Sequence, residues 1–100
     1  MDINKLMQQA QQMQKQLEDV SNSINEQEFT AEASNGLVKI TINGEYKILD
    51  LDIDSSIIVA EDKEMLQDLI VIAFNNAKEK VDESKKEQLE SIASGLNLPF

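Results

Sequence analysis

A seven-residue repeat of apolar side chains near the start of the chain constrains the fold most. This stripe alternates gaps of three and four residues, at Ile3, Leu6, Ala10, Met13, Leu17, Val20 and Ile24. The spacing predicts an amphipathic α-helix that is roughly 33 Å long. Such a helix is longer than a small sheet can cover. Part of its apolar stripe is therefore expected to meet another helix, either of this chain or of a partner.

The middle of the chain alternates with the two-residue period of β-strands. Two Asn-Gly dipeptides, at positions 35 and 43, divide it into three stretches, and such dipeptides favour tight hairpin turns. The third stretch changes phase between Ile48 and Leu49, which predicts a β-bulge. We expect three antiparallel strands in meander order, over residues 28–34, 37–42 and 46–54.

The last third of the chain predicts more helix. Glu61, Asp62 and Glu64 place acid in its expected first turn. Apolar residues then recur at helical spacing from Leu66 to Val81 and again from Leu89 to Ala93, before Gly95. The polar stretch between the two runs leaves one long helix or a helix pair as alternatives. The predicted fold class is α+β, with one domain over residues 1–100 and the order α-β-β-β-α or α-β-β-β-α-α.

The composition argues against most enzyme classes. The chain has no Cys and no His, so it lacks disulfides, thiolate nucleophiles, imidazole bases and the usual zinc ligands. It has three Phe, one Tyr and no Trp, so its core must be mostly aliphatic. We expect a protein that is not an enzyme and needs no cofactor.

One acidic series imitates a calcium-binding loop. Asp50, Asp52, Asp54 and Glu61 match acidic ligand positions of an EF-hand. The loop position that requires Gly is occupied by Ser55, however, and an alternating strand stands where the entering helix should be. The series is better explained as the solvent face of a half-buried strand, and no metal site is expected.

The charge balance limits the partners. Nineteen acidic residues oppose nine Lys, and the formal net charge is −10. This excess repels nucleic acids and anionic membranes at long range. No apolar run reaches the roughly 18 residues of a membrane span, and the opening residues do not have the pattern of a signal peptide. The expected location is the cytoplasm, without membrane contact.

Two segments depart from the acidic average. Residues 1–16 contain two lysines, Lys5 and Lys15, and one acid, Asp2. Residues 78–86 contain four lysines and three acids. Each segment therefore has a local charge of +1. On helical spacing Lys78 and Lys85 share a face and Lys80 and Lys86 lie on neighbouring faces, so residues 78–86 could form a modest basic strip. They could equally belong to a solvated face with ion pairs four residues apart, such as Asp82 with Lys86.

Four segments together resemble the YbaB/EbfC family of bacterial nucleoid-associated proteins. They are the Gln- and Met-rich opening at 6–13 and the runs 36–44, 62–77 and 95–100, in the same order as in the family. The resemblance covers nearly the whole chain. It implies a tweezer-shaped homodimer with a joined sheet and projecting helices, which binds DNA with little sequence preference and is located at the nucleoid.

The family's proposed DNA contacts correspond here to six lysines on the first and last helices: Lys5, Lys15, Lys78, Lys80, Lys85 and Lys86. This chain departs from the family in having no Arg, so bidentate phosphate contacts are absent and binding should be weak and salt-sensitive. A second hypothesis is an acidic dimeric adaptor that binds other proteins through its helices and the apolar segment 96–100.

Overall fold

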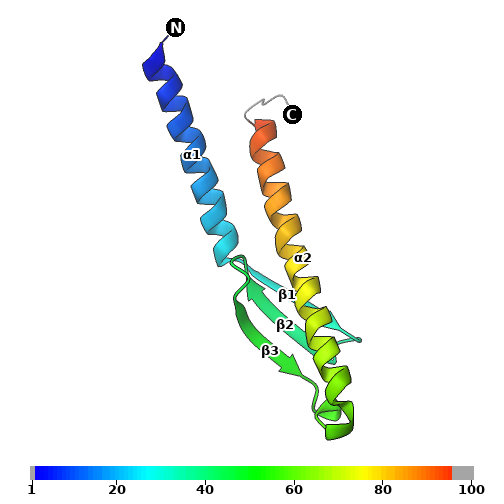
Figure 1. Cartoon of the computed structure of the whole chain (residues 1–100). Coiled ribbons are helices and arrows are strands. Elements are labelled where there is room, and N and C mark those ends of the chain that lie inside the picture. The colour runs from blue at the N-terminus through cyan, green and yellow to red at the C-terminus, as the bar shows by residue number, and fades with distance from the viewer. Residues whose placement is uncertain (1, 96–100) are drawn as a thin grey trace.

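Two long helices flank a three-stranded sheet in the computed structural model, which describes residues 2–95. The elements are α1 (Ile3–Glu26), β1 (Glu28–Ala33), β2 (Val38–Asn43), β3 (Ile48–Ile53) and α2 (Lys63–Gly95). Two 3-10 turns, Ser55–Ile57 and Ala60–Asp62, connect β3 to α2. Figure 1 shows both helices projecting past one end of the sheet, and the molecule measures 71 × 23 × 16 Å. The predicted α+β class is confirmed.

Helix α1 is anchored only at its end next to the sheet. Its first turn is capped by the Asp2 carboxylate, which accepts hydrogen bonds from the backbone N–H groups of Asn4 and Lys5 at 3.1 and 3.3 Å. Ile24 is the one residue of α1 that is buried, at 3% exposure, whereas Ile3 remains 68% exposed. The outer part of the predicted stripe therefore has little cover within a single chain.

The sheet has the predicted meander order, β1-β2-β3, with both pairings antiparallel. Its middle strand, β2, places Val38, Ile40 and Ile42 on one face, each at most 1% exposed. Every second residue of a strand points to the same face, so this alternation produces the apolar side of the sheet. The other side carries the polar residues of the three strands.

Helix α2 covers that apolar side. It contributes buried residues spaced four apart, which form one stripe along the helix: Leu69, Ala73, Ala77 and Val81. The two Ala side chains are small, so the helix can approach β1 and β2 closely. It does not cover β3, where Ile48 and Leu51 stay 51% and 42% exposed.

The two turns of the sheet differ from the predicted pair of simple hairpins. Ala33 pairs with Val38, so the first turn has four residues, and Ser34, Asn35 and Gly36 all have positive φ. In the second turn the positive φ falls on Tyr46, at 65°, and not on Gly44. The Asn-Gly dipeptides mark the turns correctly, but pairing of the strands sets the turn lengths.

The β-bulge in β3 is confirmed. Thr41 pairs with Asp50 and Ile42 with Ile48, which leaves Leu49 as the extra residue. The bulge lets Ile48 and Leu51 lie on the apolar side although their sequence spacing is odd.

Helix α2 is continuous from Lys63 to Gly95, so the helix-pair alternative is wrong. The polar stretch after Val81 contains no Gly or Pro and is rich in Glu, Lys and Gln, which favour helix without needing a core. Of the acids expected in its first turn, Glu64 lies there, and Glu61 and Asp62 belong to the preceding 3-10 turn. Among residues 2–95, no helix is both long and apolar enough to cross a membrane.

Candidate nucleic-acid interface

A polar cluster on α2 surrounds the single tyrosine of the chain. The Tyr46 hydroxyl donates a hydrogen bond to Asp82, and the Lys85 ammonium donates to the same hydroxyl at 3.2 Å. Lys78 forms an ion pair with Asp82 at 2.9 Å. Both ammonium groups also lie over the aromatic ring, Lys85 at 4.3 Å and Lys78 at 5.8 Å from its centroid. Two of the six predicted lysines are thus brought together by a residue from the β2–β3 turn.

The same contacts shift two pKa values. The Tyr46 hydroxyl and then the Lys78 ammonium lower the pKa of Asp82 by hydrogen bonding to its carboxylate. The hydrogen bond to Asp82, followed by its charge, raises the pKa of Lys78. Asp82 therefore contributes its full stabilisation of the folded state above its ordinary pKa, and this stabilisation is lost as the pH falls through the lowered pKa. The stabilisation by Lys78 is lost only at alkaline pH, as the pH rises through its raised pKa. Around neutral pH the ion pair is fully charged.

Acid titration should release Tyr46 from this cluster. Because the chain has one Tyr and no Trp, its intrinsic emission reports on that side chain alone. We expect a change in Tyr46 emission below the ordinary Asp value of 3.8, as Asp82 becomes protonated. The change should be absent in Asp82→Asn and retained in Asp68→Asn, a control on an exposed part of α2. The same acid transition in Asp82→Asn would contradict the assignment.

Lys80 is engaged on the opposite side of α2. Its ammonium donates a hydrogen bond to the backbone carbonyl of Thr30 in β1 at 2.5 Å. Lys80 was expected on a face next to that of Lys78 and Lys85, and its contact with β1 separates it from their cluster at Tyr46.

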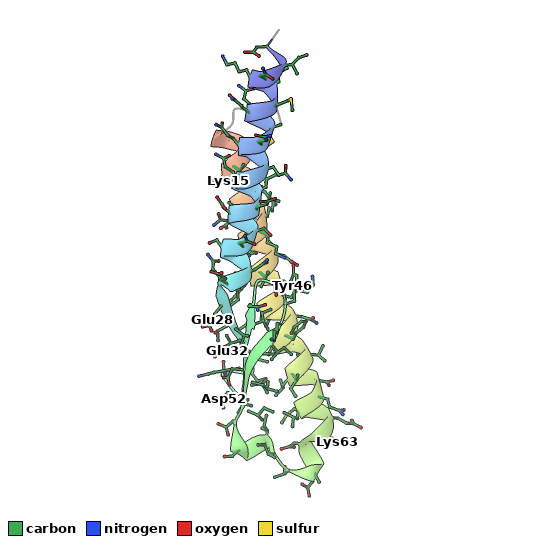
Figure 2. The ribbon with its side chains drawn as sticks, turned by 90° about the vertical axis from the view of Figure 1, so that its left-hand side faces the viewer. Lys15, Glu28, Glu32, Tyr46, Asp52 and Lys63 are labelled. Atoms are coloured by element: carbon green, nitrogen blue, oxygen red, sulfur yellow. The ribbon has the colours of Figure 1, made fainter. Side chains whose placement is uncertain are left out.

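Three of the predicted lysines extend into solvent. Lys5 and Lys15 are exposed on α1, and Lys86 is exposed on α2 beyond the sheet. In the part of the chain that the structure describes, no hydrogen bond or ion pair engages their ammonium groups. Figure 2 shows Lys15 high on the projecting helix and Lys63 at the far end of the molecule.

The groove between the two helices is lined mostly by apolar side chains. Lys85 lines it together with side chains from both helices, namely Leu17, Val20, Ser21, Ile24 and Leu89. Lys85 is thus the charged residue among the side chains that line this groove.

The sheet face turned away from α2 is acidic. Figure 2 shows Glu28, Glu32 and Asp52 along this side, below Lys15. Asp50 shares the face, because its neighbour Thr41 pairs with Thr30 across the sheet. The carboxylates of this face repel an approaching polyanion, and Lys39, which lies opposite Glu32 and Asp52, offsets only part of that charge.

Sequence reasoning missed Tyr46 and misplaced the partner of Asp82. Asp82 pairs with Lys78 and not with Lys86, because the Tyr46 hydroxyl draws its carboxylate toward the β2–β3 turn. The spacing of four residues allowed both partners. Only the folding of a turn 36 residues earlier in the chain onto α2 decides between them.

The acidic series around Asp50 forms a strand, as its alternation predicted. Asp50 and Asp52 belong to β3, and the Asp54 carboxylate caps the following 3-10 turn by accepting the Ser56 N–H at 2.9 Å. Among the described residues, no three His, Cys, Asp or Glu side chains are grouped so that they could hold a metal ion.

The comparison with models of protein families shows which family the chain belongs to. The model of the YbaB/EbfC DNA-binding family matches residues 1–96. The chain belongs to this family. The YbaB/EbfC membership confirms the resemblance seen in the sequence and implies nucleoid-associated DNA binding in a bacterium, in a family of DNA-binding proteins and not of enzymes.

A solved structure shows the same fold as this YbaB/EbfC chain. The uncharacterized protein HP0035 from Helicobacter pylori is 27% identical, with a TM-score of 0.79, and the match covers 92% of this chain and 97% of that one. The apolar segment 96–100, on which the adaptor hypothesis depends, lies outside the described residues.

Proposed function

We propose that this chain is a nucleoid-associated protein that binds duplex DNA as a homodimer, mainly through lysine contacts to the phosphate backbone and with little sequence preference. In this proposal residues 1–100 form one YbaB/EbfC-like domain in the bacterial cytoplasm. The observation that carries the proposal is that Lys5, Lys15 and Lys86 are exposed residues of α1 and α2, the two helices that project past one end of the sheet (Figure 1).

The other three lysines, Lys78, Lys80 and Lys85, are proposed to contribute to DNA binding with those ammonium N–H donors that are not used within the protein. An ammonium group has three donors, so a contact inside the protein leaves others for a phosphate. Lys78 keeps 52% of its side chain exposed although it is paired with Asp82. Its contribution to DNA binding is reduced by that carboxylate, and Lys80 is the least suited, because it is held against β1.

The homodimer is supported by apolar surface that one chain leaves in solvent. On α1, Ile3, Leu6 and Met7 are 68%, 49% and 56% exposed. Exposed apolar groups gathered on one element are typical of protein interfaces. Two copies would also double the number of lysines that one DNA segment can meet.

Contacts to the backbone are favoured over the reading of bases. Lys offers a point charge, whereas base recognition commonly uses the planar groups of Arg, Asn and Gln in a groove. The formal charge of −10 on each chain opposes approach to DNA. We therefore expect weak binding that depends on phosphate contacts and on DNA shape.

A charge-matched pair of triple variants tests this proposal. Changing Lys5, Lys15 and Lys86 to Gln should weaken binding to a short duplex by about 100-fold or more at low salt, because each lost phosphate contact costs about 1 kcal/mol there. The control changes Lys39, Lys47 and Lys63 to Gln, which alters the net charge equally but in β2, in the β2–β3 turn and at the first residue of α2. Binding is measured by mobility shift and fluorescence anisotropy.

The control variant should lose only a few-fold in affinity for DNA, because its net charge becomes more negative. Equal losses in both triple variants would contradict the assignment of the contacts to the projecting helices. No binding of the unmodified protein, even at low ionic strength, would contradict DNA binding itself.

A further inference from the structure

Both oxygens of the Asp82 carboxylate are engaged. One oxygen accepts the hydroxyl proton of Tyr46, and the other accepts an N–H of Lys78 at 2.9 Å. The hydroxyl oxygen of Tyr46 in turn accepts an N–H of Lys85 at 3.2 Å. The Tyr46 hydroxyl therefore joins a lysine to the carboxylate and fixes the direction in which the carboxylate points.

Helix geometry alone favours another partner for Asp82. Lys78 precedes it by four residues and Lys86 follows it by four, so each ammonium group is within reach of the carboxylate. A pair in which the acid precedes the lysine along the helix is the more stable one, because this order agrees with the helix dipole. The observed pair with Lys78 has the less stable order. The hydrogen bond from Tyr46, outside the helix, accounts for the choice.

The turn that presents Tyr46 to α2 has an unusual backbone conformation (Figure 2). Tyr46 has φ of 65°, a value that a bulky residue rarely adopts. Its N–H donates to the carbonyl of Asn43 at 3.0 Å, and the Asn43 side chain accepts the N–H groups of Glu45 and Lys47 at 2.8 and 3.1 Å. Bulky residues that are held in this region by their surroundings gather at functional positions.

Lys86 is the lysine that this arrangement affects most. It is exposed on α2, and among residues 2–95 no ion pair engages its ammonium group. Two other acids, Glu83 and Glu90, lie three and four residues from it, and neither is paired with it. A lysine that pairs with a carboxylate has less charge and fewer N–H donors to offer a phosphate. The direction of the Asp82 carboxylate thus controls how much of Lys86 is available.

We propose that Tyr46 is a positioning residue for DNA binding: its hydroxyl holds the Asp82 carboxylate toward Lys78 and so leaves Lys86 available to a phosphate. The inference rests on the proposed function and deepens it, because Lys86 is one of the lysines to which DNA contacts are assigned there. Tyr46 does not touch DNA in this proposal and acts only through Asp82.

Tyr46→Phe tests the hydroxyl alone. The ring is retained, so it can still lie beneath the Lys85 ammonium, but Asp82 loses one donor and can turn to Lys86. We expect the affinity for a short duplex to fall about threefold at low salt, with a shallower log–log slope against salt, because phosphate contacts are weakened. Fluorescence anisotropy measures both quantities, and far-UV circular dichroism shows whether the fold is kept. An unchanged affinity would overturn the proposal.

A second background separates positioning from a merely structural role. In Asp82→Asn the side chain has no charge to direct at Lys86, so adding Tyr46→Phe should have no further effect on DNA binding. Asp68→Asn, on an exposed part of α2, changes the net charge equally, and in that background Tyr46→Phe should still weaken binding. The same loss in the Asp82→Asn background would assign the effect to the fold of the turn and overturn the proposal.

A third background identifies the lysine. In Lys86→Gln the group that Asp82 would capture is absent, so Tyr46→Phe should again have no further effect. In Lys5→Gln, which removes a proposed contact on α1 instead, Tyr46→Phe should still weaken binding. A loss that persists in the Lys86→Gln background would mean that the released carboxylate acts on another lysine, which overturns the assignment to Lys86.

Nuclear magnetic resonance of the lysine ammonium groups gives a readout without DNA. The Lys86 signal, assigned by its absence in Lys86→Gln, should shift on Tyr46→Phe and should not respond to Tyr46→Phe in Asp82→Asn. If the unmodified protein binds no DNA, the proposed function fails and the role of Tyr46 in it fails too, whatever the signal does. If DNA binds but the Lys86 signal does not shift, the proposed function stands and the role of Tyr46 is overturned.

Discussion

Substitution of Gly44 by Ala is expected to lower the free energy of unfolding by about 3 kcal/mol or more, because the added methyl group has no space. Gly44 lies in the β2–β3 turn, directly against the last turn of α1. A Cβ atom at this position would fall on the backbone carbonyl of Ile24 and 2.8 Å from the backbone nitrogen of Asn25. Backbone atoms cannot rotate away as a side chain can, so the helix end or the turn must move.

The loss should be large because this contact holds α1 to the sheet. Ile24 is the buried anchor of α1, and it would be displaced together with its carbonyl group. The measurement is chemical denaturation followed by far-UV circular dichroism, at one protein concentration, since dimerisation would make the apparent stability depend on concentration.

Gly36→Ala provides the matched control. Gly36 has φ of +90°, which Ala adopts at a cost of about 1 kcal/mol, but its nearest neighbours are the flexible side chains of Lys39 and Glu32 at 3.3 and 3.4 Å. We expect Gly44→Ala to be clearly the more destabilising of the two. Equal losses would mean that α1 can shift freely over the turn.

The affinity for DNA is expected to fall by about two orders of magnitude between 50 and 200 mM monovalent salt. If about four lysines neutralise phosphates, the log–log slope of the binding constant against salt is near −4. The proposed contacts are Lys point charges, and the formal charge of −10 on each chain adds repulsion that is strongest at low salt. Fluorescence anisotropy of a labelled duplex, titrated at several salt concentrations, measures the slope.

Two comparisons sharpen this measurement. The triple variant at Lys5, Lys15 and Lys86 should have a shallower slope than the unmodified protein, since fewer counterions are released. Two duplexes of unrelated sequence should differ only a few-fold in affinity, because phosphate contacts carry no sequence information. A slope near zero, or a difference of orders of magnitude between the duplexes, would contradict backbone binding.

Most of the fold was predictable from local patterns. The heptad stripe gave α1 to within two residues at its end, and strict alternation placed Val38, Ile40 and Ile42 in the core. Even the bulge at Leu49 was visible as a change of phase. These features depend on neighbours within one turn or one strand, so their signals are present in the sequence itself.

Features that depend on distant contacts were not predictable. The continuity of α2 through its polar stretch was left open, since helix propensity alone could not exclude a break there. The role of Gly44 was also hidden: it appeared as a turn residue, but its nearest neighbour is the backbone of α1.

The sequence predicted which lysines belong to the candidate site, but not where they lie relative to one another or which groups they contact. Charge counting singled out Lys78, Lys80 and Lys85 together. The structure places the first and third beside Tyr46 and the second against the carbonyl of Thr30. A count of charges has no information about which side of a helix meets the sheet.

The sequence by itself determined the α+β class and the strand order, because periodicity and turn residues act over short distances, and the family was visible in it as a resemblance of four segments. Only the tertiary structure decided which lysines are engaged and which sheet edge is open, because both depend on how α2 lies across the sheet. The helix covers β1 and β2 with its buried stripe, binds the β1 carbonyls with its polar side chains, and leaves β3 uncovered. That choice is a property of packing between segments far apart in the chain.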